Sequence, residues 1–161
     1  MIYSVWTGTS GTSWNDPSNW EGKHVPGSTN VIIPHGLSNY PTSAPGPSFT
    51  LNTGLVMTME PGSRATFNSL TNNGTINLQS DPSGIASLMT GSFSGTGGSL
   101  NVMMHLTGAT DEIDRWHYIA TPAAVSKTVF TDIEPENLMS YDESKVTTDI
   151  IQGWQWHDGY D

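Results

Sequence analysis

The sequence predicts an all-β fold, a right-handed parallel β-solenoid, with a β-sandwich as the alternative. Residues 51–106 contain short runs in which apolar side chains occupy alternate positions, a pattern typical of strands with one buried face. Gly, Asn, Pro and Ser separate these runs at intervals of about ten residues. A segment with so few charges and no helical spacing must bury its apolar face against neighbouring strands, and the even spacing favours a solenoid.

Counting by twos through these runs predicts which side chains face the interior. They are Leu55, Met57, Met59, Ala65, Phe67, Ser69, Ile76, Leu78, Leu88, Leu100, Val102 and Met104. Turns are predicted at residues 72–75, 81–84 and 94–98. Asn and Gly tolerate positive φ, so the chain can reverse at Asn72-Asn73-Gly74-Thr75 with little strain.

The first 34 residues are predicted to form a tryptophan-rich N-terminal cap. Trp6, Trp14 and Trp20 lie among Gly, Asn, Asp and Pro, and residues 31–33 are the only regular strand expected there. Bulky side chains could close the open edge of a solenoid's first turn. The alternative is an exposed aromatic platform that binds sugar rings.

The composition divides the rest of the chain in two. Residues 35–107 are expected to hold an irregular, proline-rich crossing (35–50) and the solenoid repeats, and residues 108–161 an acidic C-terminal extension that begins a longer β region. Eleven of the fifteen acidic residues follow residue 110, against three basic residues. Neither part has the basic stripe that nucleic acid or anionic lipid requires. No apolar run approaches the roughly 18 residues of a spanning helix, so no membrane insertion is expected.

One loop gathers the residues that could carry chemistry. Asp111, Glu112 and Asp114 precede Arg115 and His117, and such a group could move a proton on an acidic sugar. Solvated carboxylates ordinarily collect in such loops, however, so we assign no catalytic residue and expect no enzyme. Calcium at the three carboxylates is the one cofactor considered, although their spacing does not match a calcium loop. The chain has no cysteine, which excludes disulfides and thiolate metal sites.

The order of several short motifs adds a resemblance. They are residues 6–8, 14–20, 25–27, 31–34, 70–76, 116–122 and 139–143. In this order they resemble a β-rich repeat module of large secreted and cell-surface proteins of Bacteroidetes-type bacteria. The resemblance implies export to the cell surface or beyond, and a passive structural or adhesive role beside other domains of a larger protein.

Two other functions stay open at this point. One is a glycan-binding module, with Trp6, Trp14, Trp20, Trp116 and His117 as the candidate ligand-binding residues. The other is a β-helix enzyme that acts on carbohydrate.

Overall fold

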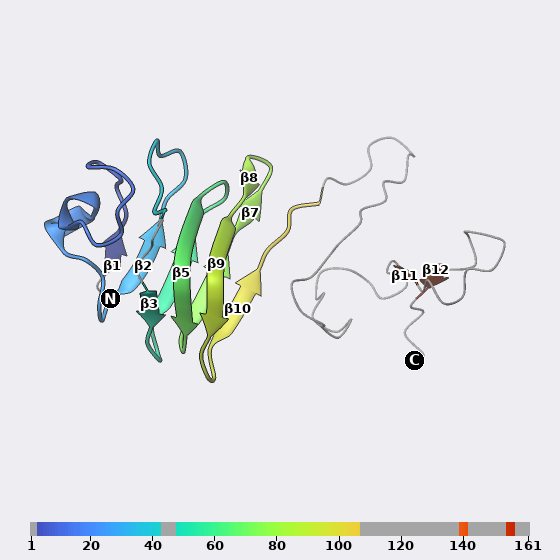
Figure 1. Cartoon of the computed structure of the whole chain (residues 1–161). Helices are drawn as coiled ribbons and strands as arrows, with labels where there is room; N and C mark the ends of the chain where they lie inside the picture. The colour runs from blue at the N-terminus through green and yellow to red at the C-terminus, as the bar shows by residue number, and fades with distance from the viewer. Residues whose placement is uncertain (1–2, 43–47, 107–138, 142–153, 157–161) are drawn as a thin grey trace. The chain divides into compact units, whose positions relative to one another are not determined.

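The computed structural model describes residues 3–42, 48–106, 139–141 and 154–156, and it confirms the β-solenoid. From β2 onward the chain passes alternately between two sheets of parallel strands, and each turn of the solenoid, here called a rung, adds a strand beside the previous one (Figure 1). The five-stranded sheet has the order β1 (Tyr3–Val5), β2 (Asn30–Ile33), β4 (Val56–Met59), β6 (Thr75–Leu78), β10 (Ser99–Val102). The three-stranded sheet has the order β3 (Ser48–Leu51), β5 (Arg64–Asn72), β9 (Ser87–Ser94).

The remaining elements are short. Two 3₁₀ turns, η1 (Pro17–Asn19) and η2 (Glu21–Lys23), lie between β1 and β2, and β7 (Ser80–Asp81) forms a hairpin with β8 (Gly84–Ile85). The chain divides into two units, Met1–Arg115 and Trp116–Asp161. In the second unit, β11 (Met139–Tyr141) pairs antiparallel with β12 (Trp154–Trp156). Within the described ranges, no helix is long and apolar enough to cross a bilayer.

Parallel register stacks the interior side chains in columns. Val31 pairs with Met57, Met57 with Ile76, and Ile76 with Leu100, so one inward column runs through four strands. The first three of these side chains are fully buried. Their alternation with Ile32, Thr58 and Asn77 is the period-two pattern of the sequence, which is confirmed for these strands.

The predicted register is wrong in the second half of β5. Ala65 and Phe67 are buried as expected, but the next buried side chain is Leu70, whereas Ser69 is only partly buried. Two outward positions, Asn68 and Ser69, therefore follow each other, and the inward face moves by one residue. Period-two counting assumes a regular strand and cannot locate such a change of phase.

At the end of the described solenoid the predicted inner face is confirmed for Leu100 and Val102, which pair with Ile76 and Leu78, but the predicted burial is wrong. Leu100, Val102 and Met104 are 38%, 48% and 42% exposed. The sequence placed them on the inner face because they continue the alternation. Within residues 3–106, no further rung packs against β9 and β10, so these positions have no neighbour on one side.

The turn at residues 72–75 forms as predicted but for a different reason. Gly74 does not have positive φ. A Cβ at this position would lie 2.4 Å from the Leu55 carbonyl oxygen and 2.7 Å from that of Asn52, so only glycine allows this approach of two rungs. Positive φ occurs instead at Gly95 and Gly97, in the predicted turn before β10.

Candidate functional site

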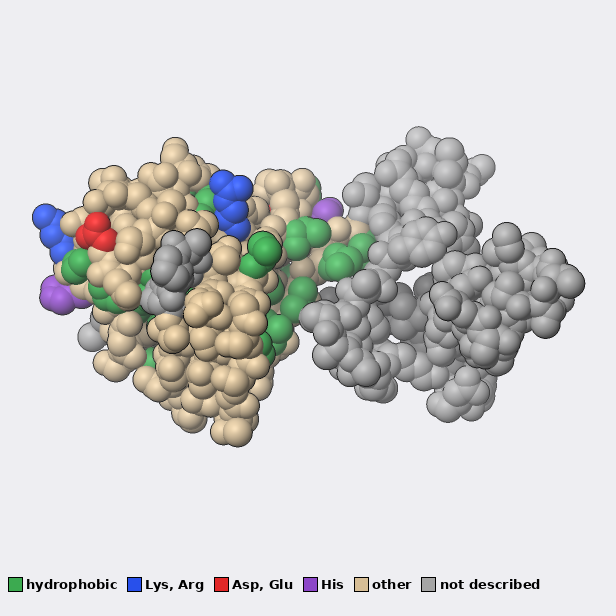
Figure 2. Space-filling model, in the orientation of Figure 1, with side chains coloured by type: hydrophobic (Ala, Val, Ile, Leu, Met, Phe, Trp, Pro, Cys, Tyr) green, Lys and Arg blue, Asp and Glu red, His purple; other side chains and the backbone are tan. Residues whose placement is uncertain are grey.

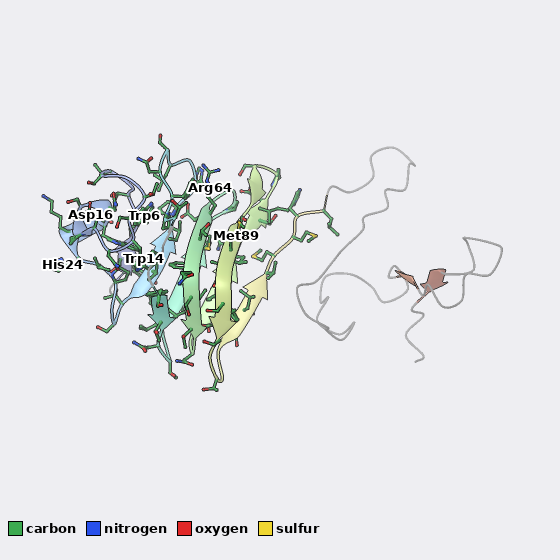
Figure 3. All side chains as sticks on the ribbon, viewed as in Figure 1. Trp6, Trp14, Asp16, His24, Arg64 and Met89 are labelled. Carbon is green, nitrogen blue, oxygen red and sulfur yellow. The ribbon has the colours of Figure 1, made fainter. Side chains whose placement is uncertain are left out.

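The tryptophan cluster, defined as Trp6, Trp14 and Trp20, lies at the N-terminal end of the solenoid. Trp6 follows β1, and Trp14 lies in the loop before η1 (Figure 3). Trp20 is the C-cap residue of η1. The three side chains are 0%, 3% and 2% exposed. Trp20 meets the other two rings edge to face, at centroid distances of 5.1 Å from Trp6 and 4.6 Å from Trp14. This geometry is favourable for aromatic pairs.

The cluster continues into the interior of the solenoid. The ring centroid of Trp14 lies 4.7 Å from that of Phe49 and 4.9 Å from that of Phe67. The indole N–H groups of Trp6 and Trp20 are hydrogen-bonded: Trp6 Nε1 donates to the Asn39 carbonyl oxygen at 2.9 Å, and Trp20 Nε1 donates to that of Trp14 at 2.8 Å. The tryptophan-rich cap is therefore part of the hydrophobic core.

The cap also belongs to the solenoid by its backbone. β1 pairs with β2 and β2 with β4, so parallel pairing begins within the first 34 residues, the segment that the sequence separates as a cap. Pro41 is fully buried and Tyr40 is buried at the same end, as part of the crossing that follows β2. The Arg64 guanidinium lies over the Tyr40 ring, 5.3 Å from its centroid.

Burial decides what the tryptophan cluster can do. A sugar-binding platform needs an open ring face, and the faces of Trp6, Trp14 and Trp20 are covered by protein. A sugar ring could reach them only if the cap opened. The other predicted site residues, Asp111, Glu112, Asp114, Trp116 and His117, lie outside the described residues, so their roles stay predictions.

Buried amides were missed by the sequence analysis, and they are structural. Asn19 is fully buried; its Oδ1 accepts from the Ser10 N–H at 2.7 Å, and its Nδ2 donates to the Ser13 carbonyl at 3.0 Å. Asn72, 4% exposed, donates to the Ser99 carbonyl at 2.9 Å and accepts from the Gly74 N–H. Inward asparagine next to a glycine turn was the available signal, since an amide can satisfy both backbone donors and acceptors.

Titratable side chains are sparse on the described solenoid. His35 lies in the bend after β2, where its backbone N–H donates to Glu60 Oε2 at 3.1 Å. The pKa of Asp16 is lowered, first by the backbone N–H of Ser18, and that of Asp81 is lowered, first by the Ser83 hydroxyl. In the part of the chain that the structure describes, no three His, Cys, Asp or Glu residues are close enough to hold a metal ion.

Hydroxyl groups line the outer face of the three-stranded sheet. Register places Ser48, Ser69 and Ser92 in one column and Thr50, Thr71 and Ser94 in the next. Within the second column, the hydroxyls of Thr71 and Ser94 are hydrogen-bonded at 3.2 Å. These two columns are polar without being charged.

Large apolar side chains are exposed at the opposite end from the tryptophan cluster. We call β9, β10 and their flanking residues, 85–104, the last rung. Seven of the eight exposed large hydrophobic side chains of the described residues belong to it: Ile85, Met89, Phe93, Leu100, Val102, Met103 and Met104. In Figure 2 hydrophobic side chains gather near this end, while most of the visible face is neither hydrophobic nor charged.

Comparison with protein-family models, with curated proteins and with solved structures finds no match for this chain.

Proposed function

We propose that the chain is a non-catalytic structural or adhesive segment of a bacterial surface protein, located outside the cell beside other domains of a larger polypeptide. The observation that carries the proposal is that aromatic and amide side chains are buried and contact the protein itself. Trp14 joins the core, Asn19 binds backbone groups of the cap, and Asn72 binds backbone groups of its own turn and of the next rung. These are the residue types that would otherwise supply a binding platform.

The satisfaction of buried polar groups supports the same role. Among the described residues, Ser63 Oγ is the one buried side-chain polar atom without a hydrogen-bond partner. Active sites commonly keep polar groups unpaired or titratable groups strongly perturbed until substrate arrives. The two shifted carboxylates described above, Asp16 and Asp81, are instead held by serine residues two positions further on. The proposal of an extracellular location rests on the resemblance to secreted and surface proteins.

A glycan array and a reducing-sugar assay on the purified 161-residue chain test the absence of sugar chemistry. We expect no binding and no release of reducing ends. Glycan binding that is lost in Trp116→Ala but retained in Trp154→Ala would establish the glycan-binding alternative. Release of reducing ends that depends on Asp111 or Asp114 would establish an enzyme.

Location is tested on intact bacteria that produce the protein. Protease added to whole cells should degrade the protein, while a cytoplasmic marker protein remains intact. Recovery of the protein only from the cytoplasmic fraction would contradict the proposal.

A further inference from the structure

The last rung combines two features that a solenoid normally hides. Its inward side chains Phe93, Leu100 and Val102 are 49%, 38% and 48% exposed. Its strands are also edge strands, since β9 pairs only with β5, and β10 only with β6, among the described strands. Exposed apolar patches of this kind mark interaction surfaces, and unpaired strand edges accept further strands.

The direction of the hydrogen bonds shows which backbone groups are available. The N–H groups of Ser99 and Met103 donate to the carbonyls of Gly74 and Leu78, each at 2.8 Å. Backbone groups alternate in direction along a strand, so the N–H groups of Leu100 and Val102 point to the free edge. Natural edge strands are usually protected by charged residues or proline. Residues 85–106 contain no Asp, Glu, Lys, Arg or Pro.

The composition of this end makes it complementary to itself. The inward positions of β9 and β10 are mostly apolar, and their outward positions are mainly Ser, with Met89 and Asn101 among them. A two-fold axis would therefore bring apolar side chains against apolar ones and hydroxyls against hydroxyls, without like charges in contact. The tryptophan cluster occupies the opposite end, so head-to-tail stacking through that end would require the cap to open.

The exposed apolar area is large enough for a dimer. An aromatic side chain has roughly 150–250 Å² of surface and Leu, Val or Met somewhat less, so seven such groups about half exposed leave on the order of 600 Å² per copy. Two copies would bury at most about 1,200 Å², the lower end of specific interfaces. Met89 faces outward beside Thr66 and would be covered only in part, so the expected dimer is a weak one.

We propose that the last rung binds a second copy of this chain, with β9 and β10 meeting the same strands of the other copy in antiparallel pairs across a two-fold axis. The dimer joins two solenoids at their open ends, and growth stops there because the described solenoid, residues 3–106, has one such end. The formal net charge of −10 opposes association, so salt should strengthen it by screening.

Sedimentation velocity of the full chain tests the proposal in about 0.15 M and higher salt. We expect a concentration-dependent dimer at up to about 100 μM protein. Val102→Pro removes a donor from the free edge without touching the bonds to β6, and Leu100→Lys places a charge in the apolar surface. Each should weaken dimerisation at least tenfold, while far-ultraviolet circular dichroism stays unchanged. Tyr3→Lys, at an exposed apolar residue on β1, is the matched control and should leave the dimer intact.

Three results would overturn the proposal. The first is a wild-type chain that remains monomeric throughout this range, whether the rung is covered by some other segment or remains open. The second is a dimer that Val102→Pro and Leu100→Lys leave unchanged, because another surface would then form it. The third is equal loss of dimer in Tyr3→Lys.

Discussion

The two ends of the described solenoid differ in how their inward apolar side chains are covered. At the N-terminal end, Trp6, Trp14 and Trp20 are buried against each other and against the first rungs. At the other end, Phe93 and Leu100 continue the interior columns of Leu70 and Ile76 but are partly exposed. An inward side chain of a solenoid is fully buried only when its rung is covered on both sides. The same residue type therefore contributes differently to stability at each end.

The largest expected difference is between aromatic residues at the two ends. Trp14→Ala should lower the free energy of unfolding by about 3–5 kcal/mol, because it removes a buried aromatic side chain from the core. Phe93→Ala should cost under about 1.5 kcal/mol, since half of its surface is already in water. Urea unfolding at dilute protein, below any association, measures both.

The comparison would fail if the two substitutions cost the same. A high cost for Phe93→Ala at every protein concentration would mean that the last rung is covered within the monomer. A low cost for Trp14→Ala would mean that the cap contributes little to the core. Trp fluorescence gives a second readout, because buried indoles should emit at shorter wavelength than exposed ones.

The sequence predicted the columns of the five-stranded sheet because local alternation and burial agree there. Met57, Met59, Ile76 and Leu78 are inward both by counting and in the structure. The change of phase between Phe67 and Leu70 could not be predicted, because no residue type is specific to it. The exposure of Leu100 could not be predicted either, since alternation identifies a face but does not show whether another rung covers it.

The candidate site was predicted only in part. The tryptophan cluster was expected as a cap and as a sugar platform, and composition alone could not decide between them, because Trp beside Asn and Gly suits both. The roles of Asn19 and Asn72 depend on which backbone groups lie within 3 Å of their amides, which spacing in the sequence does not reveal.

The second prediction compares two glycines, because the backbone is tightly packed at Gly98, before β10, and open at Gly27, in the cap. A Cβ on Gly98 would lie 2.3 Å from the Asn72 carbonyl oxygen, whereas nothing lies within 4 Å of one on Gly27. Gly98→Ala should therefore cost about 3 kcal/mol by forcing β10 away from its neighbour. Gly27→Ala should be neutral or stabilising by up to about 1 kcal/mol, because alanine restricts the unfolded chain. The urea midpoint distinguishes them, and a neutral Gly98→Ala would contradict this packing.

The third prediction expects similar losses of stability from two buried asparagines, one in the cap and one beside the last rung. Asn19→Ala and Asn72→Ala should each cost about 1–2 kcal/mol, since each leaves a backbone donor and a backbone acceptor, whose hydrogen bonds are at least partly buried, without their amide partner. Thermal unfolding by circular dichroism measures the losses. Asn77→Ala is the control: Asn77 Oδ1 accepts from Asn101 Nδ2 at an exposed position, so the change should cost under about 1 kcal/mol. If Asn77→Ala lowered stability as much as Asn72→Ala, the prediction would be wrong, because exposed and inward amides would then contribute equally.

The smallest effect is expected for the pKa values of two exposed carboxylates with the same local geometry. Asp16 and Asp81 each precede Pro and Ser, and the carboxylate of each accepts from the N–H two residues on, at 2.9 Å and 2.7 Å. These hydrogen bonds lower both pKa values below the ordinary value of about 3.9. Because the folded pKa is the lower one, the stabilisation is present above about pH 4 and is lost as pH falls through the folded pKa.

Carboxyl titration by NMR between about pH 6 and 2 should place both midpoints below that of an unstructured aspartate. Ser83 donates to the Asp81 carboxylate through its hydroxyl as well as its N–H, and the positive charge of His35 makes a smaller contribution to the lowered pKa. Ser83→Ala should therefore raise the pKa of Asp81 and leave that of Asp16 unchanged. If both carboxyl groups titrate at the ordinary value, their hydrogen bonds do not persist in solution. If the two ends shift alike, the turns are set locally and do not depend on whether the nearby rung is covered.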